Sequence, residues 1–164
     1  GKSMGVKQKD KSNKYTRYRL MWNDVIYQPG EIKVVAYNEI NQPVAEKVIV
    51  TAGEPKQIKL TADREVIKAD GKDLSYVTVE VLDKDGNLCP RAGNLLFFEV
   101  KGAGKLKALC NGDPTDHTPF SSNYMRAFNG KLVATIESDK EAGEVELVVS
   151  GGLLQKQEIR VQIQ

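Results

Sequence analysis

The chain has 164 residues, enough for one sizeable β-sandwich or two small domains, since domains usually contain roughly 100 to 150 residues. Its 24 lysines and arginines are balanced by 22 aspartates and glutamates, and the charges are scattered, which argues against nucleic acid as a partner. No stretch approaches the roughly 20 apolar residues that cross a bilayer, so no membrane partner is expected either.

Nearly all patterned segments are short, alternate apolar and polar residues with period two, and end in Gly, Pro, Asn or Asp. This pattern predicts strands joined by turns, and therefore an all-β fold. In the first third of the chain it predicts three strands, at residues 15–22, 31–37 and 44–51. Three strands are too few for a sandwich, so residues 1–54 are expected to be the C-terminal part of an incomplete immunoglobulin-like module.

Residues 52–55 (Ala-Gly-Glu-Pro) are a candidate linker, because Gly and Pro together break strand pairing. The alternation then restarts and predicts seven further strands, the number in an immunoglobulin-type sandwich. They are expected at residues 58–62, 77–83, 95–100, 105–109, 131–138, 144–150 and 158–163. Residues 55–164 are thus expected to form a complete immunoglobulin-like β-sandwich, preceded by the truncated one.

Residues 111–129 form a long connection that is rich in Asn, Asp, Pro and Ser. Long loops often carry function, so this segment is a candidate binding loop. The alternative is a Greek-key crossover between two sheets, and we favour the crossover.

Few residues suggest chemistry. The run from Asp83 to Asn87 (DKDGN) begins like a calcium loop but lacks the later glutamate, whereas Asp-Gly is a strong hairpin signal, so a turn is expected. His117 is the only histidine, and it is expected to form hydrogen bonds within its loop.

Cys89 and Cys110 lie far apart in the sequence, and neither belongs to a CxxC motif. This spacing predicts neither a zinc site nor a redox motif, and it leaves open whether the two cysteines form a disulfide. No metal or cofactor is therefore predicted.

A glycosidase would need two carboxylates on either side of the scissile bond. Glu80, Glu99, Glu137 and Glu146 all fall in predicted strands, and solvated strand faces explain them. Trp22 could stack on a sugar, but its alternation with Leu20 favours burial.

Three segments carry a family resemblance. They are residues 1–5 (GKSMG) with 20–22 (LMW) and 27–33 (YQPGEIK); residues 51–55 (TAGEP) with 60–64 (LTADR) and 69–81 (ADGKDLSYVTVEV); and residues 111–117 (NGDPTDH) with 127–130 (AFNG). Together they resemble bacterial glycoside hydrolases of family 2, the β-galactosidase and β-glucuronidase group.

This resemblance implies a C-terminal, non-catalytic piece of a larger enzyme. In the family the catalytic glutamates lie in a TIM barrel N-terminal to such modules, and no position here matches their motifs. The implied partners are that barrel and the other domains of the parent chain. Asn111, Asp113, His117 and Phe120 are the candidates for a rim or interface role. The family's use of oligosaccharides implies a periplasmic or secreted location.

An exposed sheet edge tends to pair with a neighbour, so the chain is also expected to self-associate through its truncated N-terminal sheet. Two alternative functions stay open. One is a carbohydrate-binding module, which exposed aromatic residues in a row would support; aromatic residues are only 7% of the chain and fall mostly on inward-alternating positions. The other is an adhesin-type surface spacer.

Overall fold

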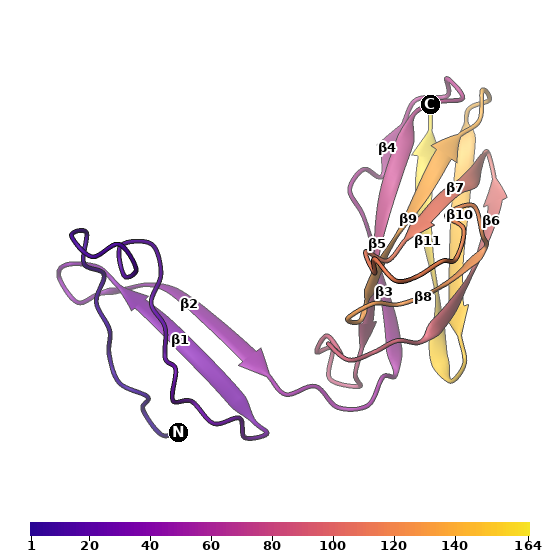
Figure 1. Cartoon of the computed structure of the whole chain (residues 1–164). Coiled ribbons are helices and arrows are strands. Elements are labelled where there is room, and N and C mark those ends of the chain that lie inside the picture. Colours follow the sequence, from indigo (N-terminus) through magenta and orange to yellow (C-terminus); the bar gives the residue numbers. More distant parts are fainter. The chain divides into compact units, whose positions relative to one another are not determined.

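The computed structural model describes all 164 residues and divides them into two compact units, residues 1–50 and residues 51–164. None of its segments forms a helix long and apolar enough to span a membrane. The strands, labelled in Figure 1, are β1 (Glu31–Tyr37), β2 (Pro43–Val50), β3 (Gln57–Ala62), β4 (Val66–Ile67), β5 (Leu74–Leu82), β6 (Leu95–Gly102), β7 (Gly104–Cys110), β8 (Tyr124–Arg126), β9 (Lys131–Ser138), β10 (Gly143–Gly151) and β11 (Leu154–Ile163).

The 1–50 unit is built on an antiparallel hairpin of β1 and β2, whose pairing begins with Glu31 opposite Val50. Asn38 closes the turn, because its Oδ1 accepts hydrogen bonds from the backbone N–H groups of Ile40 (3.1 Å) and Gln42 (2.9 Å). Such local side-chain bonds are the reason that Asn favours turns. The strands predicted at residues 31–37 and 44–51 are therefore present.

The hairpin exposes apolar side chains on both of its faces. Ile32 and Ile49 lie opposite each other on one face and are 52% and 61% exposed. Val48 and Val50 lie on the other face and are also exposed. An isolated two-stranded sheet is only marginally stable in water, so this hairpin has apolar surface that a packed domain would bury.

The prediction of a strand at residues 15–22 is wrong, because residues 11–18 form turns. Asn13 is the cause: its Oδ1 accepts hydrogen bonds from the backbone N–H groups of Tyr15 (2.9 Å) and Thr16 (3.3 Å). Asn side chains compete in this way with regular backbone pairing. Trp22 is half-buried rather than in a core, and the Lys7 ammonium lies over its ring, 5.5 Å from the centroid.

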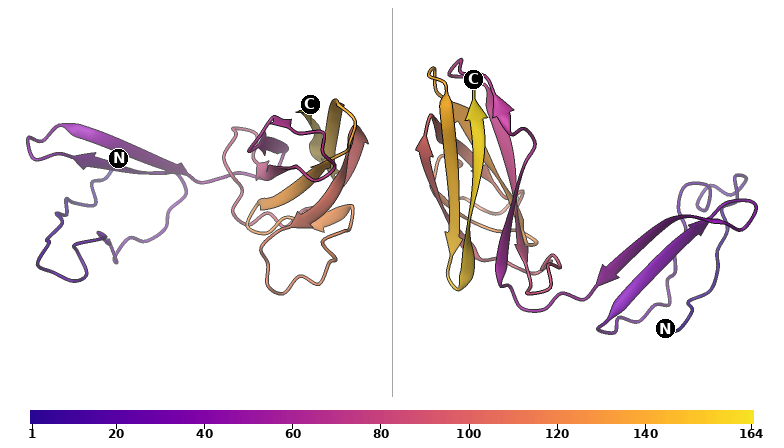
Figure 2. Two further views of the ribbon diagram at one scale, coloured as in Figure 1. Left: turned by 90° about the horizontal axis from the view of Figure 1, so that it is seen from above. Right: turned by 180° about the vertical axis from the view of Figure 1, so that it is seen from behind.

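The 51–164 unit is an all-β sandwich, seen from three directions in Figures 1 and 2. Its strands follow the order β7-β9-β5-β3-β11-β10-β6-β8, and β4 pairs with β11. Neighbouring strands are antiparallel except at β11, which runs parallel to β3 and β4. All seven strands expected here are present, and the immunoglobulin-like sandwich is confirmed. Strands β4 and β8 were not predicted.

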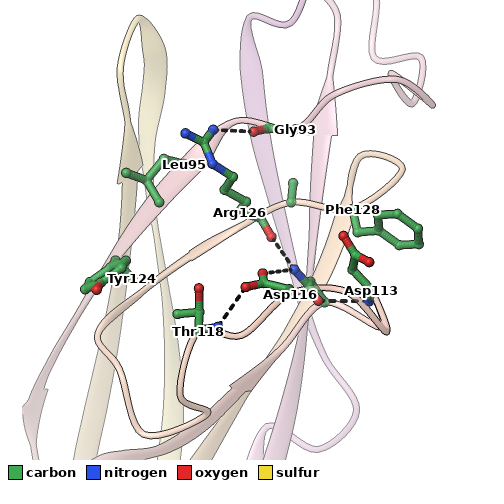
Figure 3. Close-up of a pocket in the computed structure, with 10 residues that line it drawn as sticks. Gly93, Leu95, Asp113, Asp116, Thr118, Tyr124, Arg126 and Phe128 are labelled. Atoms are coloured by element: carbon green, nitrogen blue, oxygen red, sulfur yellow. Dashed lines mark hydrogen bonds between the residues drawn. The ribbon is translucent and has the colours of Figure 1, made fainter.

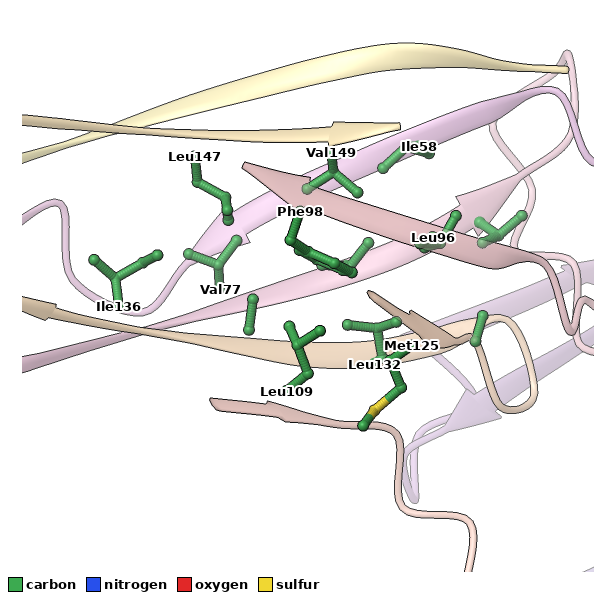
Figure 4. Packing of buried hydrophobic residues seen from close by; sticks show 14 of the residues in the cluster. Ile58, Val77, Leu96, Phe98, Leu109, Met125, Leu132, Ile136, Leu147 and Val149 are labelled. Atoms are coloured by element: carbon green, nitrogen blue, oxygen red, sulfur yellow. The ribbon is translucent and has the colours of Figure 1, made fainter. Parts of the chain in front are cut away.

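One layer of the sandwich consists of β7, β9, β5 and β3, and the other of β11, β10, β6 and β8; the core lies between them (Figure 4). The strands contribute alternate residues to it, as period two requires, and each side chain of the cluster is at most 8% exposed. The largest contributions come from Val77, Val79 and Val81 of β5, Leu96 and Phe98 of β6, Leu132 and Ile136 of β9, and Val145, Leu147 and Val149 of β10.

The chain passes from one layer to the other between β6 and β7, and Gly102 makes the turn possible. Its φ of +94° is a conformation that residues with a side chain rarely adopt. A Cβ at this position would also overlap the carbonyl oxygen of Glu144 on β10. That carbonyl accepts the backbone N–H of Ala103 at 3.0 Å, so it is held in place.

Candidate functional site

The segment at 111–123 leaves β7 in one layer and reaches β8 at the edge of the other layer, before β9 returns to the first. Asn111 organises it. Its Nδ2 donates to Asp116 Oδ2 (2.6 Å) and to the carbonyl of Arg126 (3.1 Å), and its Oδ1 accepts the N–H of Asp113 (2.9 Å). The segment is thus a crossover that its own polar side chains hold in shape.

Asp116 is the second organising residue of this segment. Its Oδ1 accepts the backbone N–H of Thr118 at 2.8 Å. This bond, the Thr118 side chain, the Asn111 amide and nearby His117 hold the pKa of Asp116 below its ordinary value. Asp116 is therefore a fixed negative charge at neutral pH.

A hollow of about 600 Å³ opens beside this segment (Figure 3). Figure 3 shows Leu95 and Tyr124 on one side of it and Asp113 and Phe128 on the other, with Asp116 between them. Its full lining is Gly93, Leu95, Asn111, Asp113, Asp116, Thr118, Tyr124, Arg126, Ala127 and Phe128. A second hollow of about 320 Å³ shares Asn111, Asp113 and Asp116 and is bordered by Phe120.

Of the four candidate residues, Asn111 and Asp113 border both hollows and Phe120 borders only the smaller one. His117 is exposed and borders neither. The sequence interpretation missed Tyr124 and Arg126, which lie on β8. A signal was present, since Tyr124-Met125-Arg126 alternates exposed, buried and exposed side chains, but three residues are too short a run to stand out.

The aromatic residues were expected at inward positions, and this expectation is wrong. Phe98 alone is fully buried and Trp22 is half-buried, whereas every other aromatic side chain is at least 37% exposed. In the 51–164 unit, four exposed rings gather around the crossover segment, at Phe97, Phe120, Tyr124 and Phe128, and only Tyr76 lies elsewhere. Of the two grounds against a carbohydrate-binding function, the inward position of the aromatic residues is thereby removed, while their low content of 7% remains.

The run from Asp83 to Asn87 is a turn, as expected. Both carboxylate oxygens of Asp83 are occupied by protein donors: Oδ2 accepts the N–H of Gly53 (2.8 Å), and Oδ1 accepts those of Asp85 and Asn87 (both 2.9 Å). The Gly53 bond is the main reason that the pKa of Asp83 falls from 3.8 to about 2. The carboxylate of Asp83 thus links the backbone at Gly53 to the turn that follows β5.

Replacing Asp83 by asparagine is expected to destabilise the chain at neutral pH but not in acid. Because the folded pKa lies below the unfolded one, the charge contributes stability above about pH 4 that is lost as the pH falls through about 2. The gap between the thermal midpoints of the two proteins should therefore be constant from pH 7 to 4 and shrink towards pH 2. A gap that stays the same at pH 2 would contradict this role.

The strand glutamates are engaged in ion pairs. Glu137 Oε1 and Oε2 lie 2.8 Å and 2.6 Å from the Nζ atoms of Lys105 and Lys107, which hold the pKa of Glu137 below its ordinary value. Glu80 lies 2.8 Å from Lys131 Nζ, and its pKa is lowered for the same reason. These carboxylates are stabilised as anions.

Both thiols are free, so the disulfide left open by the sequence is absent. Cys89 is buried, and its burial raises the pKa of the thiol. Cys110 is exposed at the end of β7. No group of three or more His, Cys, Asp or Glu side chains is placed to hold a metal ion.

A two-layered sandwich of this strand order is an immunoglobulin-like β-sandwich domain. Residues 58–160 match the model of the glycoside hydrolase family 2 C-terminal domain 5, and residues 1–45 match a domain of unknown function (DUF4982). The chain belongs to glycoside hydrolase family 2, as its sequence resemblance indicated.

Individual relatives agree with this assignment. Over 156 residues the chain is 46% identical to the β-galactosidase BoGH2A of Bacteroides ovatus, a match that covers 94% of this chain and 18% of the relative. The solved β-glycosidase of Bacteroides vulgatus is 31% identical, with a TM-score of 0.80 over 84% of this chain and 18% of that structure. The chain therefore spans about a fifth of such relatives, and its residues 58–160 correspond to a C-terminal domain of the family.

Proposed function

We propose that this chain is a non-catalytic structural and interaction segment of a family 2 glycoside hydrolase whose parent protein is of the β-galactosidase type. The match of residues 58–160 to a C-terminal domain of that family carries the proposal. Within it, residues 55–164 act as a complete immunoglobulin-like sandwich, and residues 1–54 as part of a second one.

Two glutamates of the strands, Glu80 and Glu137, support the non-catalytic role. The acid of a glycosidase must stay protonated near neutral pH, which requires a raised pKa. The lysines beside Glu137 and Glu80 move the pKa values of these two groups in the opposite direction. Neither side chain is suited to protonate a leaving group.

The chain by itself is therefore expected to hydrolyse neither nitrophenyl β-galactoside nor nitrophenyl β-glucuronide. Release of nitrophenol measured by absorbance tests this, with the β-galactosidase of Bacteroides ovatus as the positive control. Turnover by the chain that disappears in Glu137→Gln or Glu80→Gln would overturn the proposal.

The exposed hairpin of β1 and β2 is the second part of the proposal. Its apolar faces are suited to pack against other domains of the parent chain, and in their absence against a second copy. The chain should then self-associate as its concentration rises, and Ile32→Lys with Ile49→Lys should weaken this, because a buried charge is costly. Light scattering that finds a monomer at all concentrations would contradict the prediction.

A further inference from the structure

Exposed aromatic rings concentrate at one edge of the 51–164 unit. Tyr124 and Phe128 border the larger hollow and are 43% and 37% exposed. Phe97, 48% exposed, extends this surface along β6, with its ring centroid 6.3 Å from that of Tyr124. The two rings come from residues paired across β6 and β8, so the sheet fixes their spacing. The edge thus presents a preformed aromatic surface beside a cavity.

Polar groups with fixed positions face the same hollow. Arg126 donates through one nitrogen to the carbonyl of Gly93 at 3.1 Å, which leaves further N–H groups of the guanidinium for a ligand. Asp113 is held by Thr115, whose N–H and hydroxyl both bond Oδ1, at 2.9 Å and 2.7 Å. Donors and acceptors are therefore already oriented before any ligand arrives, which lowers the entropic cost of binding.

We propose that this hollow binds a neutral saccharide. A pyranose has an apolar C–H face, which packs on an aromatic ring, and a rim of hydroxyl groups, which pair with carboxylate and guanidinium groups. The volume of about 600 Å³ lies within the range of small-ligand pockets, roughly 300–1,000 Å³. This inference goes beyond the proposed structural role and depends on the hollow alone.

The charges of the lining determine which sugars fit. Asp113 and Asp116 bring two negative charges to the hollow, and Arg126 brings one positive charge. A uronic acid would add a third carboxylate to this excess of negative charge, which opposes its binding. A neutral galactoside or glucoside meets no such repulsion. The site is thus selective for uncharged sugars.

The test is to titrate the 164-residue chain with lactose, cellobiose and glucuronic acid, and to measure binding by isothermal titration calorimetry and ligand-observed NMR. We expect saturable binding of a neutral disaccharide in the millimolar range and none of glucuronic acid. Tyr124→Ala should weaken the affinity roughly tenfold or more, and Arg126→Gln similarly, since each removes a main contact. Tyr76→Ala is the matched control, because Tyr76 is 45% exposed but lies on β5, away from the hollow. The affinity of this variant for the disaccharides should be unchanged.

Three results would overturn the proposal. They are the absence of saturation by either neutral disaccharide, preferential binding of glucuronic acid, and an equal loss of affinity in the Tyr76→Ala control. Thermal midpoints equal to that of the unsubstituted chain would show that each variant is folded. Because the replaced side chains are exposed, we expect those midpoints to be unchanged.

Discussion

Replacing Phe98 by alanine is expected to lower the free energy of unfolding of the 51–164 unit by about 3–5 kcal/mol. The side chain is 4% exposed and belongs to the continuous core between the two layers. Truncation removes a buried ring and leaves a cavity that β6, paired on both sides by β8 and β10, cannot fill by moving. Since domains have a stability of roughly 5–15 kcal/mol, this is a large fraction of the total.

Phe97 provides the matched control for this variant. It is the adjacent residue on the same strand and has the same side chain, but it faces outward and is 48% exposed. Phe97→Ala should therefore cost less than about 1 kcal/mol. Urea denaturation followed by circular dichroism measures both. Equal losses in the two variants would contradict the assigned faces of β6.

Replacing Gly102 by alanine should also destabilise the unit severely. The φ of +94° costs an L-residue about 1–2 kcal/mol, and the added methyl group would overlap the carbonyl oxygen of Glu144. Relieving such an overlap in packed surroundings costs about 1–3 kcal/mol more. The expected result is a large drop of the urea midpoint with an unchanged slope.

Gly86→Ala separates these two contributions. Gly86 has a φ of +84°, but a Cβ there would meet no atom within 4 Å. This variant should lose only the conformational part, about 1–2 kcal/mol. If Gly102→Ala lost no more than Gly86→Ala, the close approach of β6 to β10 would not be a constraint on the fold.

The strands of the sandwich could be predicted because their signal is local. Val77, Val79 and Val81 alternate with polar residues, and burial of one sheet face imposes that alternation. Strands β4 and β8 were missed for the opposite reason. They are two and three residues long, and their pairing depends on distant partners, such as Gln162 for Val66 and Leu96 for Met125. No local pattern contains that information.

The same limit applies to the candidate site. The polar composition of the crossover segment predicted Asn111 and Asp113, which both border the larger hollow. The places of Tyr124 and Phe97 follow from the register between β8 and β6, which the sequence does not state. At residues 15–22, the alternation predicted a strand, but the backbone N–H groups of Tyr15 and Thr16 instead donate hydrogen bonds to the side chain of Asn13, which forms a turn.

The position of β11 has a consequence for the order of events during synthesis. This strand is the last of the 51–164 unit, yet it lies in the sheet between β3, the first strand of the unit, and β10. The backbone N–H of Gln155 bonds the carbonyl of Lys56 at 3.1 Å, across almost the whole length of the unit. Because a chain emerges from the ribosome N-terminal end first, β3 can pair with β11 only after this last strand of the unit has been made. The nascent unit is therefore expected to fold late, after translation of its final strand, and slowly, since it depends on a long-range contact.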